Sequence, residues 1–323
     1  MTLKDISKDI IESKKIGLTF HVSPDGDAIG STLALLNGLR ELGKDSYIIS
    51  REVIADNLSF LPLGEEINGD IPEPIKGTDM VIVLDCGNYE RICANLENYD
   101  GKLINIDHHV TNENYGTSNY VEVSSAATAE IVYLLLKELG FDFKEKDEIN
   151  EKIGRCIYTS LVTDTGGFRH SNVTERTHKI ASELIAIGVN NTKIHNNLFD
   201  NRPYEKIKLI GEALNNLELL LDGKLSAIKL SKKLLDSYNL GNVDTSDVIS
   251  MALGIKGVEV ALVLKEVEDG VKGSLRSRED FDVRKVAEVL GGGGHIKAAG
   301  FKMKNLSLDE AFNKVIIEIE KEI

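Results

Sequence analysis

The sequence has no tryptophan, few cysteines and a shortage of basic charge, and each absence excludes a class of protein. Three cysteines are an odd number without metal-type spacing, which argues against a disulfide framework and favours the cytoplasm. With 38 Lys and Arg against 52 Asp and Glu, the net charge of −14 argues against binding long nucleic acid or a membrane surface. No apolar run approaches the roughly 20 residues that span a bilayer. The amphipathic pattern at the N-terminus favours a helix over a targeting segment.

What is present fits a two-domain α/β protein of 323 residues with 42% hydrophobic and 28% charged residues. In residues 1–190, stretches with strand character alternate with stretches of helical periodicity. The predicted strands are 15–21, 46–50, 80–84 and 103–106, and the predicted helices are 28–42, 126–139, 149–163 and 174–187. Ser124 and Ser125 are candidate caps for the second helix. The alternation predicts a doubly wound parallel sheet.

The remaining chain has a different pattern. Residues 191–221 are helical and polar, and we interpret them as a helical linker. Residues 222–323 contain predicted strands at 225–230, 259–264 and 271–275. Ser307 and Glu310 form a capping box that opens a last helix. These features predict a smaller α/β domain with a mixed sheet.

Acidic and histidine side chains recur where elements of the first domain end. Because the carboxyl ends of parallel strands face one crevice, we expect these side chains to converge. Converging carboxylates repel one another, and two divalent cations would remove that repulsion. Mixed Asp and His ligation suits Mn²⁺, which we prefer, or Co²⁺, Fe²⁺ or Zn²⁺. Each aspartate taken alone could simply cap a helix. The predicted metal ligands are His21, Asp25, Asp27, Asp85, His108 and Asp164.

A glycine run in the second domain predicts an anion site. The backbone N–H groups of a Gly-rich loop can point into one concavity and bind a phosphate. Arg276 and Arg278 would lie on one face of a strand, with Ser277 opposite. The alternative is a flexible loop beside solvated charges. The predicted contacts to a nucleotide's phosphate or sugar are Arg276, Ser277, Arg278, Gly292, Gly293, Gly294 and His295.

Four separated motifs resemble those of the DHH phosphoesterase superfamily. Asp107-His108-His109 is the triplet that names the superfamily, and His21-x-x-x-Asp25-x-Asp27, Asp85 and Asp164 match its other motifs. The resemblance implies that Asp85 bridges two ions. One ion would be held by His21, Asp25 and Asp85, and the other by Asp27, Asp85, His108 and Asp164. It also implies catalytic roles for Asp85, for His109, which would face the substrate phosphate, and for Asp107, which would orient a ligand.

The stretch Gly292–Gly300 resembles the glycine motif of the DHH-associated domain, and Arg276 and Ser277 match that domain's other signature. The two-domain form resembles the group of bifunctional oligoribonucleases and phosphatases of 3′-phosphoadenosine 5′-phosphate (pAp). This resemblance implies hydrolysis of short oligoribonucleotides to mononucleotides and of pAp to AMP. The smaller domain would hold the nucleotide's terminal phosphate or sugar.

Three other functions stay open at this point. A phosphodiesterase for cyclic dinucleotides or for linear pApA or pGpG would use the same catalytic groups. A non-catalytic nucleotide-binding protein would not need six metal-binding side chains. A nuclease for long single strands is disfavoured by the acidic charge and the 6% aromatic content. A homodimer is compatible with the sequence.

Overall fold

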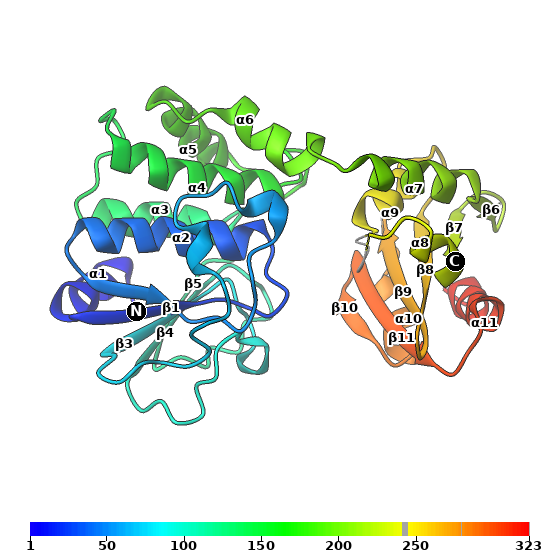
Figure 1. The fold of residues 1–323 in the computed structure, drawn as a ribbon, viewed down its shortest axis with the longest axis horizontal. Coiled ribbons are helices and arrows are strands. Elements are labelled where there is room, and N and C mark those ends of the chain that lie inside the picture. Colours follow the sequence, from blue (N-terminus) through cyan, green and yellow to red (C-terminus); the bar gives the residue numbers. More distant parts are fainter. Residues whose placement is uncertain (241–244, 279, 323) are drawn as a thin grey trace. The chain divides into compact units, whose positions relative to one another are not determined.

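The computed structural model describes residues 1–240, 245–278 and 280–322, and the chain forms two compact units, residues 1–201 and 202–323 (Figure 1). The boundary falls inside the stretch that we interpreted as a linker. Helix α6 (Asn191–His195) and the π-helical turn η4 (Asn196–Asp200) belong to the first unit. Helix α7 (Tyr204–Asn215) belongs to the second and begins after Pro203, whose missing N–H prevents it from continuing a preceding helix.

The first unit is built on a parallel five-stranded sheet in the order β2-β1-β3-β4-β5, which confirms the predicted α/β class. The chain runs outward from β1 in both directions, so the strand order reverses between β1 and β3. This reversal is the point where open α/β sheets bind their ligands. The strands are β1 (Lys15–Thr19), β2 (Asp45–Ile48), β3 (Met80–Leu84), β4 (Lys102–Asp107) and β5 (Ser118–Val121).

The helices of this unit form one large core with one face of the sheet. Ile6 of α1, Leu33 of α2 and Ile157 of α4 belong to the same buried cluster as Leu18 and Ile82 from the strands. The opposite face is covered by residues from connecting segments, including Ile92, Ala94 and Leu96. The short turns of this unit are η1 (Asp56–Leu58), η2 (Gly64–Glu66) and η3 (Tyr89–Arg91). The helices are α1 (Leu3–Glu12), α2 (Gly26–Glu41), α3 (Thr128–Glu138), α4 (Glu148–Asp164) and α5 (Glu175–Ala186).

The predicted caps of α3 are wrong. The N-cap residue is Ala127, whose side chain cannot accept a hydrogen bond. The first N–H groups of α3 instead donate to the carboxylate of Asp27, from Thr128 at 2.7 Å and from Ala129 at 3.2 Å. A distant carboxylate therefore does what a local Ser would do. As a result, Asp27 is fixed against the start of α3.

The second unit contains a six-stranded mixed sheet in the order β10-β11-β9-β8-β7-β6. Only β7 and β8 pair in parallel, and the predicted mixed sheet is confirmed. Two buried clusters cover its faces, one with α10 and α11 and the other with α7 and α9. The strands are β6 (Glu218–Leu220), β7 (Leu225–Leu230), β8 (Val260–Val267), β9 (Gly270–Ser277), β10 (Gly293–His295) and β11 (Ala298–Lys304). The further helices are α8 (Lys232–Asp236), α9 (Ser246–Leu253), α10 (Val283–Val289) and α11 (Leu308–Glu320).

The capping box that opens α11 is present, because Ser307 and Glu310 exchange the hydrogen bonds that the sequence predicts. Within the described residues, none of the helices has the length and apolar character needed to cross a lipid bilayer.

Candidate active site

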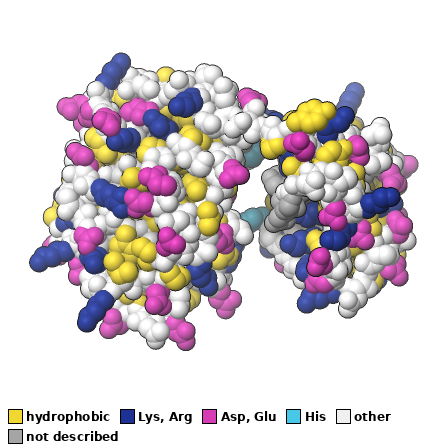
Figure 2. Space-filling view, viewed as in Figure 1, with side chains coloured by type: hydrophobic (Ala, Val, Ile, Leu, Met, Phe, Trp, Pro, Cys, Tyr) yellow, Lys and Arg dark blue, Asp and Glu magenta, His cyan; other side chains and the backbone are white. Residues whose placement is uncertain are grey.

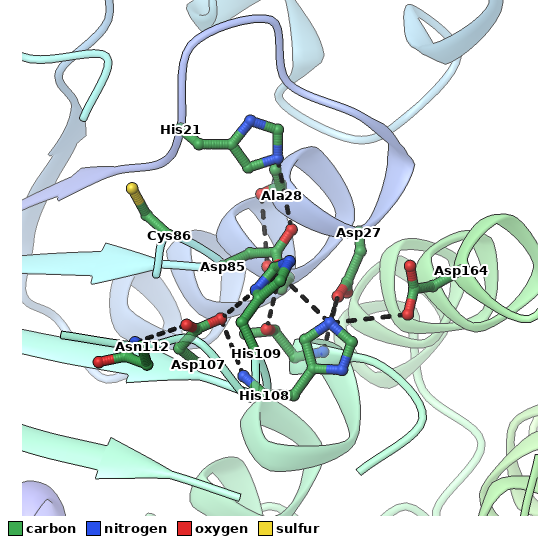
Figure 3. Close-up of polar contacts among 12 residues, drawn as sticks. His21, Asp27, Ala28, Asp85, Cys86, Asp107, His108, His109, Asn112 and Asp164 are labelled. Carbon is green, nitrogen blue, oxygen red and sulfur yellow. Dashed lines mark hydrogen bonds and ion pairs between the residues drawn. The ribbon is translucent and has the colours of Figure 1, made fainter. Parts of the chain in front are cut away.

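The structure brings all six predicted metal ligands together at the carboxyl edge of the first sheet. Figure 3 labels His21, Asp27, Asp85, His108 and Asp164. His21 follows β1 and Asp85 follows β3, on either side of the strand-order reversal. His108 follows β4, and Asp164 is the last residue of α4. Asp25 caps α2, and Asp27 lies in its first turn. Segments that follow three parallel strands and the ends of two helices thus direct their side chains to the same edge of the sheet.

Asp85 lies at the centre of this group. Its carboxylate is buried, and its two oxygens face different histidines. Oδ2 is 3.6 Å from Nε2 of His21, and Oδ1 is 3.6 Å from Nε2 of His108. The backbone of Asp85 adopts a left-handed conformation with φ of +54°, which aspartate tolerates better than most residues. The hydroxyl of Thr128 donates to Oδ1 at 3.0 Å. The carboxylate therefore lies between two sets of ligands.

Backbone carbonyls determine which nitrogen each of these histidines presents. Nδ1 of His21 lies 2.9 Å from the carbonyl of Val22, and Nδ1 of His108 lies 3.1 Å from the carbonyl of Ser125. A carbonyl only accepts hydrogen bonds, so Nδ1 must carry the proton in both rings. Nε2 then keeps its lone pair and faces the carboxylates. This is the usual arrangement for a metal-binding histidine.

The donor set fits a pair of divalent ions. Nε2 of His108 lies 3.7 Å from Asp27 and 3.6 Å from Asp164, and Nε2 of His21 lies 3.9 Å from Asp25. Metal–ligand bonds of about 2.1 Å place neighbouring ligand atoms about 3.0–3.4 Å apart, only slightly closer than observed. Within each possible ligand group, all donor atoms lie within 4.8 Å of one another. Carboxylate and imidazole together are a donor set for transition-metal ions.

The third member of the triplet is oriented differently. Nδ1 of His109 bonds to Oδ1 of the buried Asp107 at 2.7 Å, which fixes the orientation of the imidazole ring. Asp107 also accepts from the backbone N–H of His108 at 2.8 Å and from the side-chain amide of Asn112. His109 is 30% exposed, whereas Asp107 is fully enclosed. This arrangement holds the imidazole ring of His109 at the open side of the cluster.

Burial and mutual repulsion raise the pKa values of some carboxyl groups, whereas neighbouring histidines lower the pKa of Asp85. Burial raises the pKa of Asp27 well above its ordinary value, and the charges of Asp85 and Asp164 raise it further. Burial also raises the pKa of Asp164 to about 7, although His108 opposes this. Asp85 is buried too, but its interactions with His21, His109 and His108 outweigh burial and lower its pKa to about 2. Asp85 is therefore the carboxylate that stays charged most easily.

The pKa of His109 is raised. Burial alone would lower it, but the hydrogen bond to Asp107 and the charges of Asp85 and Asp107 raise it to about 9. Burial also acts to lower the pKa of His21, and Asp85 more than compensates. Without metal ions, both rings therefore hold a proton more strongly than a solvated histidine does.

Several residues in contact with the cluster were not predicted from the sequence. Thr128 reaches Asp85 and Asp27, Ser160 of α4 donates to Oδ1 of Asp27 at 2.6 Å, and Asn112 holds Asp107. Asn112 is only three positions after His109, so proximity to the triplet was an available signal. No sequence signal marks Thr128 or Ser160, because their roles depend on helix packing.

In the second unit, the last two glycines of the run belong to an edge strand, β10, and not to the loop that we expected. Gly293, Gly294 and His295 pair with β11. A Cβ on Gly292 would lie 2.1 Å from the carbonyl oxygen of Gly300, and Gly294 has φ of +142°. Close packing on β11 therefore accounts for two of the glycines. Gly293 has open space where a side chain would be.

The pairing places His295 and Arg276 in one cross-strand row. His295 pairs with Ala298 of β11, and Ala298 pairs with Arg276 of β9. Residues in such a row share one face of the sheet, and the small side chain of Ala298 separates the two larger ones. Ser277 points to the opposite, buried side, where its hydroxyl donates to the carbonyl of Phe281 at 2.6 Å. Arg278 is exposed beyond the end of β9.

The shifted pKa values predict that the metal-free protein loses stability as the pH rises. An aspartate with a raised pKa stabilises the fold only while it keeps its proton. The contribution of Asp164 to the free energy of unfolding is therefore lost as the pH rises from its ordinary pKa of 3.8 to about 7. His109 loses its contribution between 6.5 and about 9. In EDTA, we expect the melting temperature to fall by roughly 5 °C or more from about pH 5 to about pH 9.

Differential scanning fluorimetry over this pH range measures the effect. Asp164→Asn should flatten the lower part of the profile, and Mn²⁺ should abolish most of the decline because it replaces the protons. A melting temperature that rises with pH in EDTA would contradict this description of the site.

Comparison with known proteins identifies the family. The model of the DHH family, N-terminal domain, matches residues 15–161, and that of the DHHA1 domain matches residues 230–322. The bifunctional oligoribonuclease and PAP phosphatase NrnA of Thermus thermophilus is 34% identical over 95% of this chain and 90% of that protein. The protein of the same name from Bacillus subtilis is 30% identical over 93% of this chain and 92% of that protein. Among solved structures, an exopolyphosphatase-related protein from Bacteroides fragilis has a TM-score of 0.90 and 26% identity, covering 99% of this chain and 95% of that one. The chain therefore belongs to the DHH family and carries a C-terminal DHHA1 domain.

Proposed function

We propose that this protein is a phosphoesterase dependent on two divalent metal ions, which hydrolyses short oligoribonucleotides to mononucleotides and pAp to AMP. The observation that carries the proposal is the placement of Asp85, whose oxygens face His21 on one side and His108 on the other. A single carboxylate placed in this way can bridge two ions. The names of the two curated relatives, both of which span nearly the whole chain, supply the substrate class.

In this proposal His21, Asp25 and Asp85 hold one ion, while Asp27, Asp85, His108 and Asp164 hold the other. When bound, the pair lowers the pKa of a water and neutralises charge on phosphate oxygens. His109 presents Nε2 to the substrate because Asp107 holds its Nδ1. A protonated His109 can deliver its Nε2 proton to the departing ribose oxygen. Asp107 keeps the ring oriented and stabilises its charge.

Manganese is the ion that we propose. Mg²⁺ favours oxygen ligands, whereas two of the six side chains proposed to hold ions here are imidazoles. Mn²⁺ accepts both donor types and has enough coordination positions left for phosphate oxygens.

The second unit supplies the proposed nucleotide grip. His295 and Arg276 flank Ala298 on one face of the sheet, and this spacing suits a phosphate contacted by two basic side chains. Gly293 leaves the edge strand open to close approach by a ligand. The buried hydroxyl of Ser277 supports the turn through Phe281, so we propose a structural role for Ser277 in place of a direct contact.

The surface charge supports a short substrate. On the face drawn in Figure 2, Lys and Arg side chains are interspersed with Asp and Glu side chains on both units. Long nucleic acids bind to extended stripes of basic residues, because many phosphates must be neutralised at once. A net charge of −14 opposes such binding, whereas a di- or trinucleotide needs only local cations.

Asp85→Ala should remove both ions and lower activity by about 1,000-fold or more, because the substitution deletes the one side chain that reaches both ligand groups. Metal content measured by mass spectrometry and pAp hydrolysis with added Mn²⁺ check the prediction. Asp100→Ala, which removes an exposed carboxylate from the same unit, serves as the control. It should keep the metal content and the pAp hydrolysis of the wild type. Full activity of Asp85→Ala would refute the bridging role.

Arg276→Ala should raise KM for pAp and short RNA by about 10- to 100-fold, as expected for the loss of a charge-assisted hydrogen bond. Metal content should stay unchanged, because Arg276 belongs to the other unit. Lys272→Ala removes a basic side chain from the same strand, four positions away, and should leave KM unaltered. Parallel loss of metal and activity in Arg276→Ala would contradict its proposed role in substrate binding.

A substrate panel tests the function itself. With Mn²⁺, we expect mononucleotides from RNAs of about two to five nucleotides and AMP from pAp, at rates about 10-fold or more above those for a long single strand. Cleavage confined to cyclic di-AMP, pApA or pGpG would instead identify a dinucleotide phosphodiesterase. Tight nucleotide binding without any phosphate or nucleotide release would identify a non-catalytic binding protein.

A further inference from the structure

Arg176 joins three parts of the first unit beside the metal centre. From the first turn of α5, its guanidinium donates to Glu130 at 2.7 Å, to Glu122 at 2.9 Å and to the hydroxyl of Ser125 at 2.8 Å. Glu130 is completely buried and also accepts from Thr177 at 2.6 Å. The rigid, planar fork of an arginine fixes the positions of all the groups that it bonds. It therefore holds the connection between β5 and α3 and the first two residues of α3, which together we call the 122–129 segment.

The 122–129 segment contacts three of the proposed metal ligands. The carbonyl of Ser125 accepts from Nδ1 of His108 at 3.1 Å. The N–H groups of Thr128 and Ala129 donate to Asp27, and the Thr128 hydroxyl donates to Asp85. These bonds set the direction in which His108 and Asp27 present their ligand atoms.

The other half of the centre is held locally. Nδ1 of His21 bonds to the carbonyl of its neighbour Val22, and Asp25 accepts from the N–H groups of Asp27 and Ala28 in its own helix turn. These supports all lie within residues 21–28, far from Arg176 in the sequence. Apart from Asp85, which both ions share and which Thr128 contacts, the two halves of the centre therefore depend on different parts of the fold.

We propose that Arg176 is a positioning residue for one ion of the pair, the ion held by Asp27, His108 and Asp164 together with the shared Asp85. The inference rests on the metal-dependent function proposed above. Arg176 acts through Ser125: its guanidinium fixes the side chain of Ser125, and the carbonyl of Ser125 fixes the ring of His108. Loss of Arg176 allows this ring to turn and the start of α3 to shift, so the affinity for that ion falls while the His21 ion keeps its ligands.

The test is a Mn²⁺ titration of Arg176→Met, which retains much of the aliphatic stem and removes the donors. We expect the affinity for one ion to fall by about 10- to 100-fold, as is typical when a group that supports a ligand is lost. The affinity for the other ion should stay within about twofold of the wild type. At a concentration that loads both sites of the wild type, the electron paramagnetic resonance spectrum should change from that of a coupled Mn²⁺ pair to that of a single Mn²⁺.

Two further variants serve as comparisons. Arg155→Met removes an arginine that pairs with Glu151 on α4, and it should leave both affinities and the coupled spectrum intact. Arg176→Lys keeps the charge but lacks the fork, so we expect an intermediate loss confined to the same ion.

Removal of Arg176 leaves the buried Glu130 without its cation, so Arg176→Met can lower stability. Glu122→Gln weakens the bond between Arg176 and the 122–129 segment but leaves the ion pair between Arg176 and Glu130 in place. It should reduce the affinity for the same ion by a smaller factor. If these variants lower the affinity for both ions equally, or lower the affinity for neither, the proposed role of Arg176 is overturned. Failure of the wild type to bind two ions would overturn the proposed metal-dependent function itself, and this inference with it.

Discussion

Repulsion between buried carboxylates is the constraint on which this site depends. Asp27 and Asp85 are almost completely enclosed and share the site with Asp164. Burial and the neighbouring charges raise the pKa of Asp27 and Asp164, so the cluster favours protons or metal cations over an empty anionic state. The fold offsets part of this cost with donors that it places around Asp27: two N–H groups of α3 and the hydroxyl of Ser160. Divalent ions would offset the rest, so metal binding and stability are coupled.

The same contacts serve both folding and the site. Asp27 caps α3 and belongs to a possible ligand group, and Asp25 caps α2 and belongs to another. The carbonyl groups of Val22 and Ser125 satisfy one nitrogen of a histidine and thereby turn the other toward the carboxylates. A site built in this way needs no mobile side chain to assemble, because its ligands are fixed by the ends of helices and strands.

In the second unit, the main constraint is the close packing of neighbouring strand backbones. Gly292, directly before the edge strand β10, packs so tightly on β11 that it has no room for a side chain, and Gly294 has a backbone conformation that favours glycine. The result is an open strand edge beside a row that contains His295, Ala298 and Arg276. Small residues in this stretch are thus needed for packing.

The sequence alone determined the alternation of strands and helices in the first unit, and with it the edge at which His21, Asp85 and His108 would meet. Period and spacing are local properties, and the carboxyl ends of parallel strands meet at one edge whatever the details. Strand β5 escaped prediction because its four half-buried residues lack a clear alternation. The cap of α3 by Asp27, the support of His108 by Ser125 and Arg176, and the conversion of the glycine run into a strand were decided by the tertiary structure. Each depends on contacts between residues far apart in the chain, whose distances no local pattern encodes.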